Sequence, residues 1–180
     1  MSRKLIYCSL ISILLIITLL CLFIVSKPKK KSDAVKFKEE FEKYNDSSNV
    51  VLNIDESNPF VYRDEKEIEK ILRKNTGMIY LGNPTDDDSR KVLKTILKLA
   101  KENDVNKIYY VNTKNVESKK IKNYINKDIC IIFVIAGEET ATFTNAEFSK
   151  MAIMGRSIPG EVKYYMQQTF NEYCDETCDD

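Results

Sequence analysis

The stretch GMIYLGNPTDDDSRKVLKTILKLA, residues 77–100, predicts a buried strand that passes through a short turn into an amphipathic helix. Residues 78–81 are an apolar run of strand length, with a glycine on either side. After Ser89 the apolar residues recur at steps of three and four, as they do on one face of a helix: Val92, Leu93, Ile96, Leu97 and Ala100. We therefore expect the functional site at the turn between strand and helix.

The turn contains a capping-box pattern, in which Thr85 is followed three residues later by Asp88. In this pattern the Thr85 hydroxyl accepts from the N3 amide and the Asp88 carboxylate accepts from the Thr85 amide. The assignment places Asp86, Asp87 and Asp88 in the first helical turn. There the helix dipole favours each carboxylate by roughly 0.3–1 kcal/mol, less their mutual repulsion.

A strand that ends in an apolar-Gly-x-Pro-Thr turn, followed by a four-residue site, an arginine and an amphipathic helix, resembles the active-site region of thioredoxin-fold proteins. The residues that carry the resemblance are Gly82, Pro84, Thr85 and Arg90. In particular, the chain resembles the membrane-anchored thioredoxin-like proteins of Gram-positive bacteria, some of which are labelled bacteriocin-transport accessory proteins. Those proteins carry C-x-x-C where residues 86–89 read DDDS in this chain, so both redox sulfurs are absent.

The rest of the chain alternates helix and strand signals. We expect helices at 32–45, 64–76, 86–100, 116–126 and 161–173, strands at 50–54, 78–81, 107–112, 129–136 and 140–143, and a loop with a short helical piece at 145–160. Ser32 is the expected N-cap of the first helix, and Asp64 with Glu67 repeats the capping-box spacing. This order implies an α/β fold with three layers and a mixed central sheet, as in the thioredoxin fold, over roughly residues 33–173.

The resemblance also marks a second departure from the redox-active proteins. Thioredoxin-fold oxidoreductases usually place a cis-proline just before the penultimate strand, facing the cysteines. Ile129 stands at that position in this chain, and a non-proline cis bond would cost about 2.5–4 kcal/mol. We therefore expect a trans peptide and an altered substrate groove.

Composition excludes several classes of function. The chain has no histidine, which removes Ser-His-Asp and Cys-His catalysis, His-containing zinc sites and the usual general base at neutral pH. Its formal net charge is only +1, so no global field favours nucleic acid. No P-loop, G-x-G-x-x-G motif or nucleophile elbow occurs. We expect neither a cofactor nor a metal.

The N-terminal region predicts a membrane anchor. Residues 5–26 are uncharged and mostly Leu and Ile, and as a helix they would span the roughly 30 Å hydrocarbon core. We expect a transmembrane anchor at 1–26, a basic linker at 27–31, the thioredoxin-like domain at 32–173 and an acidic, cysteine-containing tail at 174–180. The linker lysines outnumber the two basic residues before the span, and the positive-inside rule alone would place the domain in the cytoplasm. The short basic leader, the tail cysteines and the resemblance favour the outside of the cell membrane.

The five cysteines fall into three groups. Cys8 and Cys21 lie in the predicted span, as apolar side chains or acylation sites. Cys130 lies in the most apolar strand, which indicates a buried, inert thiol. Cys174 and Cys178 are a candidate local disulfide, with a free pair or a functional redox or metal pair as the alternatives.

The main hypothesis is a redox-inactive binding or accessory module for a membrane or secretion partner at the cell envelope, with residues 86–88 as the contact. Those acids could instead only cap a helix, or bind a basic segment or a divalent cation. The alternative function is a thiol-disulfide oxidoreductase that uses Cys174 and Cys178, and a third possibility is an inert spacer.

Overall fold

The computed structural model describes residues 31–147, 160 and 162–169. The chain divides into two units, Met1–Lys31 and Ser32–Asp180, and the second unit contains the helices and strands of the fold. Its elements in chain order are α2 (Asp33–Glu42), the 3-10 turn η1 (Asn45–Ser47), β1 (Phe60–Tyr62), α3 (Glu65–Lys74), β2 (Gly77–Gly82), α4 (Asp87–Glu102), β3 (Ile108–Asn112), the 3-10 turn η2 (Thr113–Asn115), α5 (Lys119–Asn126), β4 (Ile129–Ile135) and β5 (Glu138–Thr144). Residues 162–169 are also helical.

The five strands form one mixed sheet in the order β1-β3-β2-β4-β5. β1 and β2 both pair in parallel with β3, whereas β4 is antiparallel to β2 and forms a hairpin with β5. β2 is thus the central strand, and it joins the parallel half of the sheet to the antiparallel half. The predicted mixed α/β architecture is confirmed at this level.

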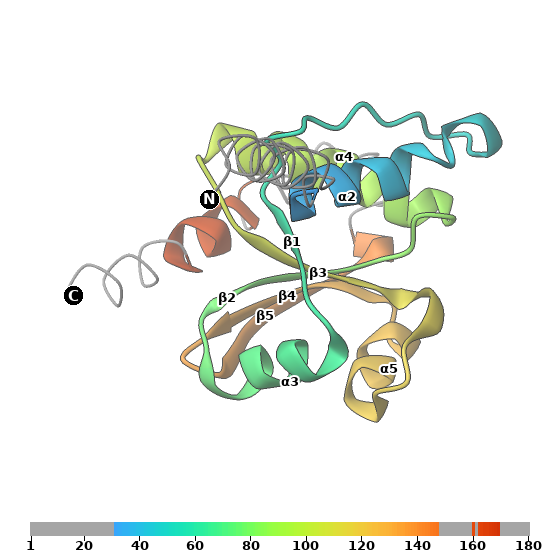
Figure 1. Ribbon diagram of the computed structural model, residues 1–180. Helices are drawn as coiled ribbons and strands as arrows, with labels where there is room; N and C mark the ends of the chain where they lie inside the picture. Colours follow the sequence, from blue (N-terminus) through green and yellow to red (C-terminus); the bar gives the residue numbers. More distant parts are fainter. Residues whose placement is uncertain (1–30, 148–159, 161, 170–180) are drawn as a thin grey trace, which may run out of the picture. The chain divides into compact units, whose positions relative to one another are not determined.

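Helices cover both faces of the sheet (Figure 1). Successive strand residues point to opposite faces, so Tyr80 and Tyr110 pack with α2 and α4, while Ile79 and Tyr109 pack with α3 and α5. Both sets of side chains are buried. Each helix faces the sheet with the apolar stripe that its sequence period predicts.

Two of the predicted helix starts are confirmed. The Ser32 hydroxyl accepts from Val35 N at 3.3 Å, as expected of an N-cap. At the start of α3, Asp64 Oδ1 accepts from Glu67 N at 2.8 Å and Glu67 Oε2 accepts from Asp64 N at 3.3 Å, which completes the capping box. The helix predicted at 64–76 ends slightly earlier than expected, since α3 stops at Lys74 with Asn75 as its C-cap and Gly77 begins β2.

The predicted first strand at 50–54 is wrong, because this segment pairs with no strand and the first strand is β1. Its side chains still alternate, with Leu52 and Ile54 buried and Val51 exposed. Its backbone groups form hydrogen bonds with side chains instead of with a neighbouring strand. Leu52 N donates to Asn45 Oδ1 at 3.0 Å, and Leu52 O accepts from Asn45 Nδ2 at 2.8 Å. Ile54 N donates to Glu42 Oε1 at 2.7 Å.

Other predictions fall wholly or partly outside the described residues. The anchor at 1–26 and the tail at 174–180 lie outside them, as do parts of the 145–160 loop and of the last helix.

Within the described ranges, none of the helices combines the length and the apolar character that crossing a membrane requires.

Candidate functional site

The sequence predicts a functional site in a strand-to-helix turn, and the structure contains that turn between β2 and α4. We call residues 83–89 the site turn. Gly82, the last residue of β2, is in register with Asn112 at the end of β3. The site turn therefore leaves the sheet at the carboxyl ends of parallel strands, where α/β proteins commonly bind ligands.

The N-cap of α4 is Asp86, not Thr85. Asp86 Oδ2 accepts from Ser89 N at 2.7 Å, and the helix begins at Asp87. Thr85 is held instead by Asn83, whose Oδ1 accepts from Thr85 N at 3.0 Å and from its hydroxyl at 2.8 Å. The predicted Thr85–Asp88 capping box is wrong, since Asn83 binds the threonine and the aspartate one residue later is an equally good cap.

Asp87 connects the site turn to the loop after α2. Its carboxylate accepts from the Ser48 hydroxyl at 2.5 Å and from Asn49 Nδ2 at 2.8 Å. These two hydrogen bonds, first that of Ser48, lower the pKa of Asp87 below its ordinary value. Asp87 therefore stays ionised at neutral pH and serves the structure of the loop.

Asp88 is exposed, as is Asp86, whereas Asp87 is partly buried. Its carboxylate forms an exposed ion pair with Lys91 at 2.8 Å, and that hydrogen bond raises the pKa of Lys91. The three aspartates thus have three different intramolecular partners and do not converge on one point. Among the described residues, no group of three or more acidic or cysteine side chains is placed to hold a metal ion.

Ser89 is buried and fully engaged. The Tyr80 hydroxyl donates to the Ser89 carbonyl at 2.9 Å and lies 3.0 Å from Ser89 Oγ, which also accepts from Asn83 N at 2.9 Å. Burial raises the pKa of Tyr80 well above its ordinary value, so this hydroxyl remains protonated. The arrangement fixes the site turn onto β2, and the Ser89 hydroxyl is hydrogen-bonded to Tyr80 and Asn83.

Arg90, the next residue, is completely buried beneath the site turn. Its Nε donates to Val50 O at 3.0 Å, Nη1 donates to Phe41 O at 2.6 Å and to Pro84 O at 3.0 Å, and Nη2 donates to Asn45 Oδ1 at 2.5 Å and to Val50 O at 2.8 Å. One guanidinium thereby ties the end of α2, the loop after it and the site turn together.

The charge of Arg90 is stabilised mainly by oxygen dipoles. Burial lowers its pKa, and the nearby Asp87 carboxylate opposes that shift. Phe41 O belongs to the last turn of α2, where the helix dipole is negative. The sequence motif includes Arg90 but assigns it no structural role. The sequence does contain one sign that Arg90 is buried. Arg90 lies three residues before Leu93, and this spacing places it on the apolar face of the helix.

Ile129 is the first residue of β4 and is half-buried; like Tyr124 and Ile125, it packs against the buried cluster that contains Ile132. β4 runs antiparallel to β2, with Ile131 opposite Tyr80. Ile129 therefore lies at the start of the strand that pairs with β2, and its part in a substrate groove stays a prediction. The described residues contain no cis peptide bond.

Cys130 is buried, and its thiol contacts Phe143 O at 3.3 Å. Burial raises the pKa of Cys130 well above its ordinary value, as expected of an inert thiol. Cys8, Cys21, Cys174 and Cys178 lie outside the described residues.

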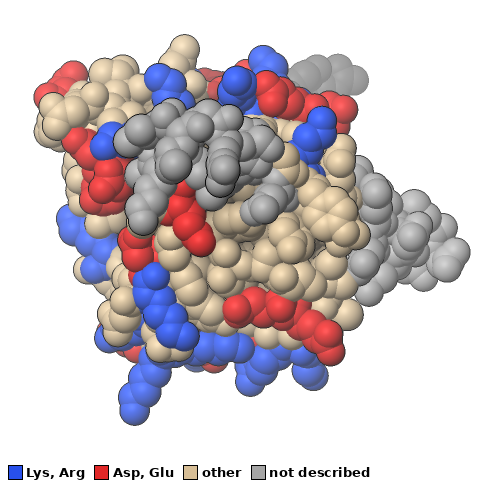
Figure 2. Space-filling view, turned by 180° about the vertical axis from the view of Figure 1, so that it is seen from behind, with Lys and Arg blue, Asp and Glu red and all other residues tan. Residues whose placement is uncertain are grey.

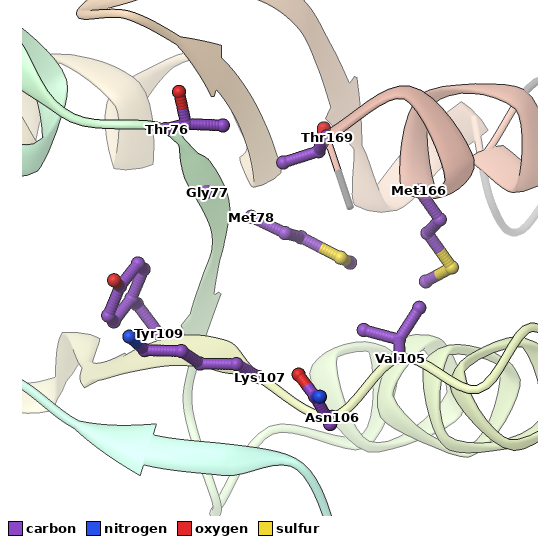
Figure 3. A pocket seen from close by; sticks show the side chains of 9 residues that line it. All are labelled: Thr76, Gly77, Met78, Val105, Asn106, Lys107, Tyr109, Met166 and Thr169. Atoms are coloured by element: carbon purple, nitrogen blue, oxygen red, sulfur yellow. The ribbon is translucent and has the colours of Figure 1, made fainter. Parts of the chain in front are cut away.

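A separate small pocket lies at the other end of β2. Thr76, Met78 and Tyr109 line it from the sheet side, and Met166 and Thr169 line it from the last helix (Figure 3). Tyr109 can lie against the β2 backbone because residue 77 is glycine, where a Cβ would meet the ring at 2.5 Å. The lining is mostly apolar and adds no chemistry to the site turn.

Basic and acidic side chains are interspersed on the face seen in Figure 2, where basic ones lie along both the lower and the upper edge.

Comparisons with protein-family models, with curated proteins and with solved structures found no match for this chain.

Proposed function

We propose that this chain is a membrane-anchored, redox-inactive protein of the thioredoxin-like class, in which the site turn binds a membrane or secretion partner at the cell envelope. The mixed sheet, its closing hairpin and the helices on both faces support the proposed class. So does the position of the site turn, which follows the central strand as the redox site does in the resembling proteins.

The proposal depends on one observation: each of the four side chains at positions 86–89 has an intramolecular partner. Asp86 caps α4, Asp87 holds the preceding loop, Asp88 pairs with Lys91 and Ser89 is locked by Tyr80. A carboxylate cannot exchange with a disulfide, and at this site the carboxylates and the serine hydroxyl all have structural partners. The site turn is therefore built to keep a shape rather than to react.

The site turn is exposed to solvent on one side only. Thr85, Asp86 and Asp88 are exposed, while Ser89 and Arg90 are buried below them. Val51 is 64% exposed, and the residue before it, Val50, accepts a hydrogen bond from Arg90, so an exposed apolar side chain lies next in the chain to a residue that Arg90 holds. A face held rigid by Arg90 loses little entropy on binding, which favours association. A partner segment with basic residues around an apolar one would complement it.

The test is a crosslinking pull-down from membranes of cells that express the full chain, comparing Asp88→Lys with Glu102→Lys. The two acids lie on the same helix, are both exposed, and each pairs with one lysine of that helix. We expect Asp88→Lys to lose the captured partner and Glu102→Lys to retain it. Equal capture by both variants would show that the acidic face is not the contact.

Two further measurements address the rest of the proposal. Protease added to intact cells should cleave the domain if it lies outside the membrane, and full protection would place it in the cytoplasm.

An insulin-reduction assay tests the alternative function, a thiol-disulfide oxidoreductase. Activity that disappears in Cys174→Ser would replace the binding function by a thiol-disulfide oxidoreductase using Cys174 and Cys178.

A further inference from the structure

The two helices that cover one face of the sheet, α3 and α5, have a basic outer surface. They lie on the same side of the sheet, opposite α2 and α4 (Figure 1). Their seven basic side chains are all exposed: Lys66, Lys70, Arg73 and Lys74 on α3, and Lys119, Lys120 and Lys122 on α5. We call these seven residues the basic face. The two helices contain only three acids, all of them on α3.

The three acids of α3 hold the helices in place instead of neutralising the basic face. Glu65 accepts from Glu117 N at 2.8 Å and from Ser118 N at 2.5 Å, at the start of α5. Glu69 Oε1 accepts from the Ser118 hydroxyl at 2.5 Å, and Glu67 completes the capping box of α3. The first two contacts join α3 to α5, so the basic side chains of the two helices share one support.

The lysines of the opposite layer have acidic neighbours. Four lysines of α2 and α4 form ion pairs with an acid of their own helix, at distances of 2.8–4.0 Å. Within the described part of the chain, no side chain of the basic face forms an ion pair. Lys66, Lys70 and Lys74 follow one another at steps of four, and like charges at this spacing repel each other on a helix. An anionic surface would relieve that repulsion.

The composition of the basic face indicates the kind of anion that it fits. Six of its seven residues are lysines, which act as point charges, whereas arginine supplies the planar fork of donors that recognises a single phosphate. Among the described residues, the exposed large apolar side chains are Val51 and Tyr164, and neither belongs to α3 or α5. The basic face therefore offers no aromatic platform for bases and no apolar side chain for insertion into a bilayer. It suits a diffuse layer of negative charge.

We propose that the basic face binds the headgroups of an anionic lipid bilayer, without insertion into the hydrocarbon. Clusters of about 4–8 basic residues on amphipathic helices are typical of surfaces that bind anionic headgroups. The predicted anchor at 5–26 would keep the domain close to such a surface, because the linker 27–31 spans at most about 18 Å when fully extended. The unit that contains the basic face begins directly after this linker, at Ser32.

This contact has a consequence for the site turn. The site turn is supported from the opposite layer, since Arg90 donates to Phe41 O at the end of α2. Binding through the basic face places α2 and α4 on the far side of the sheet from the bilayer. The site turn would then remain accessible to a partner. The inference goes beyond the proposed partner contact and does not depend on it.

The test is lysine footprinting of the full chain reconstituted in vesicles of phosphatidylcholine, with or without phosphatidylglycerol. A membrane-impermeant acylating reagent labels the domains outside the vesicles, and peptide mass spectrometry measures the reactivity of Lys70 and Lys120 relative to Lys94. Lys94 is an exposed lysine of α4 and is the control within the same molecule. An anionic bilayer concentrates protons about threefold at its surface, which lowers the reactive, neutral fraction of an amine by the same factor.

We expect this reactivity ratio to fall about threefold or more in the anionic vesicles. It should return to the phosphatidylcholine value at about 1 M salt, which screens charges beyond about 3 Å. An equal ratio in both kinds of vesicle, or a lowered ratio that persists in high salt, would overturn the proposal. Protection by a duplex oligonucleotide but not by anionic vesicles would also overturn it, and would assign the basic face to nucleic acid.

Two charge-reversal variants identify the surface. Lys70→Glu combined with Lys120→Glu should abolish the protection of Lys66, whereas Lys98→Glu combined with Lys101→Glu, on α4, should retain it. Equal protection of Lys66 in the two variants would contradict the assignment. The vesicles contain no other protein, so a negative result here leaves the capture of a partner by the site turn unaffected, and each proposal can fail separately.

Discussion

Replacing Arg90 by methionine tests how the site turn is held. The substitution retains an unbranched side chain but removes five hydrogen bonds to four oxygens, three of which are backbone carbonyls. Hydrogen bonds from a charged group contribute about 1.5–3 kcal/mol each. Much of that sum is offset, because methionine removes the cost of burying a charge and because water can reach some of the oxygens that Arg90 bound. We expect a net loss of about 3–5 kcal/mol in the free energy of unfolding, because the oxygens that lose their donor cost about 1–3 kcal/mol each where they stay buried and unsatisfied.

The assay is urea unfolding of the full chain, followed by far-UV circular dichroism because the chain contains no tryptophan. For a chain of this size the predicted loss lowers the melting temperature by roughly 6–20 °C. Arg90→Lys should recover little of it, since an ammonium cannot reproduce the planar fork of donors. The matched control is Lys98→Met, an exposed lysine of the same helix, which should leave the midpoint unchanged. An Arg90→Met protein as stable as this control would refute the reasoning.

Three other predictions concern the cap of α4 and two buried groups. Asp86→Ala should destabilise the fold by about 0.5–2 kcal/mol through loss of the N-cap, and Thr85→Ala should cost clearly less; equal losses in urea would restore Thr85 as the cap. Native Cys130 should resist iodoacetamide and react only in urea, which peptide mass spectrometry can measure; rapid native labelling would contradict its burial. Burial raises the pKa of the Glu40 carboxyl in the folded protein. The folded state therefore favours the protonated carboxyl. The fold is stabilised below the unfolded-state pKa of about 4.3, and this stability is lost as the pH rises from there through the higher folded-state pKa. Glu40→Gln should remove this loss, and an identical pH profile in both proteins would contradict it.

Local patterns in the sequence were sufficient for most elements of the fold. The Asp64–Glu67 capping box and the Ser32 cap depend on residues within one helical turn, and both occur as predicted. The apolar runs that became β2, β3 and β4 were long enough to be recognised from composition alone. Such features require no knowledge of distant parts of the chain.

Predictions failed where distant or competing partners decide the outcome. Buried and exposed side chains alternate in residues 50–54 as they do in a strand. The backbone of this segment is hydrogen-bonded to the side chains of Asn45 and Glu42 instead of to another strand. The cap of α4 shifted by one residue because Asn83 binds Thr85. Periodicity could not reveal either competition.

The sequence predicted the turn between β2 and α4, but not the contacts that hold it in place. The oxygens that bind Arg90 come largely from residues 41–50, about 40 or more positions earlier in the chain. The bonds of Asp87 to Ser48 and Asn49 have a similar separation. The sequence showed three adjacent acids, whereas the fold assigns each of them a different partner.

The central claim is that the face above the site turn binds a partner without thiol chemistry. The most direct measurement places a photoreactive residue at Thr85 in the full chain, with Glu102 as the control position, and irradiates intact membranes. We predict one covalent adduct from position 85, absent from position 102, lost when Asp88 is changed to Lys and unaffected by Cys174→Ser. Identical adducts from both positions, or an adduct from position 85 that requires Cys174, would contradict the account.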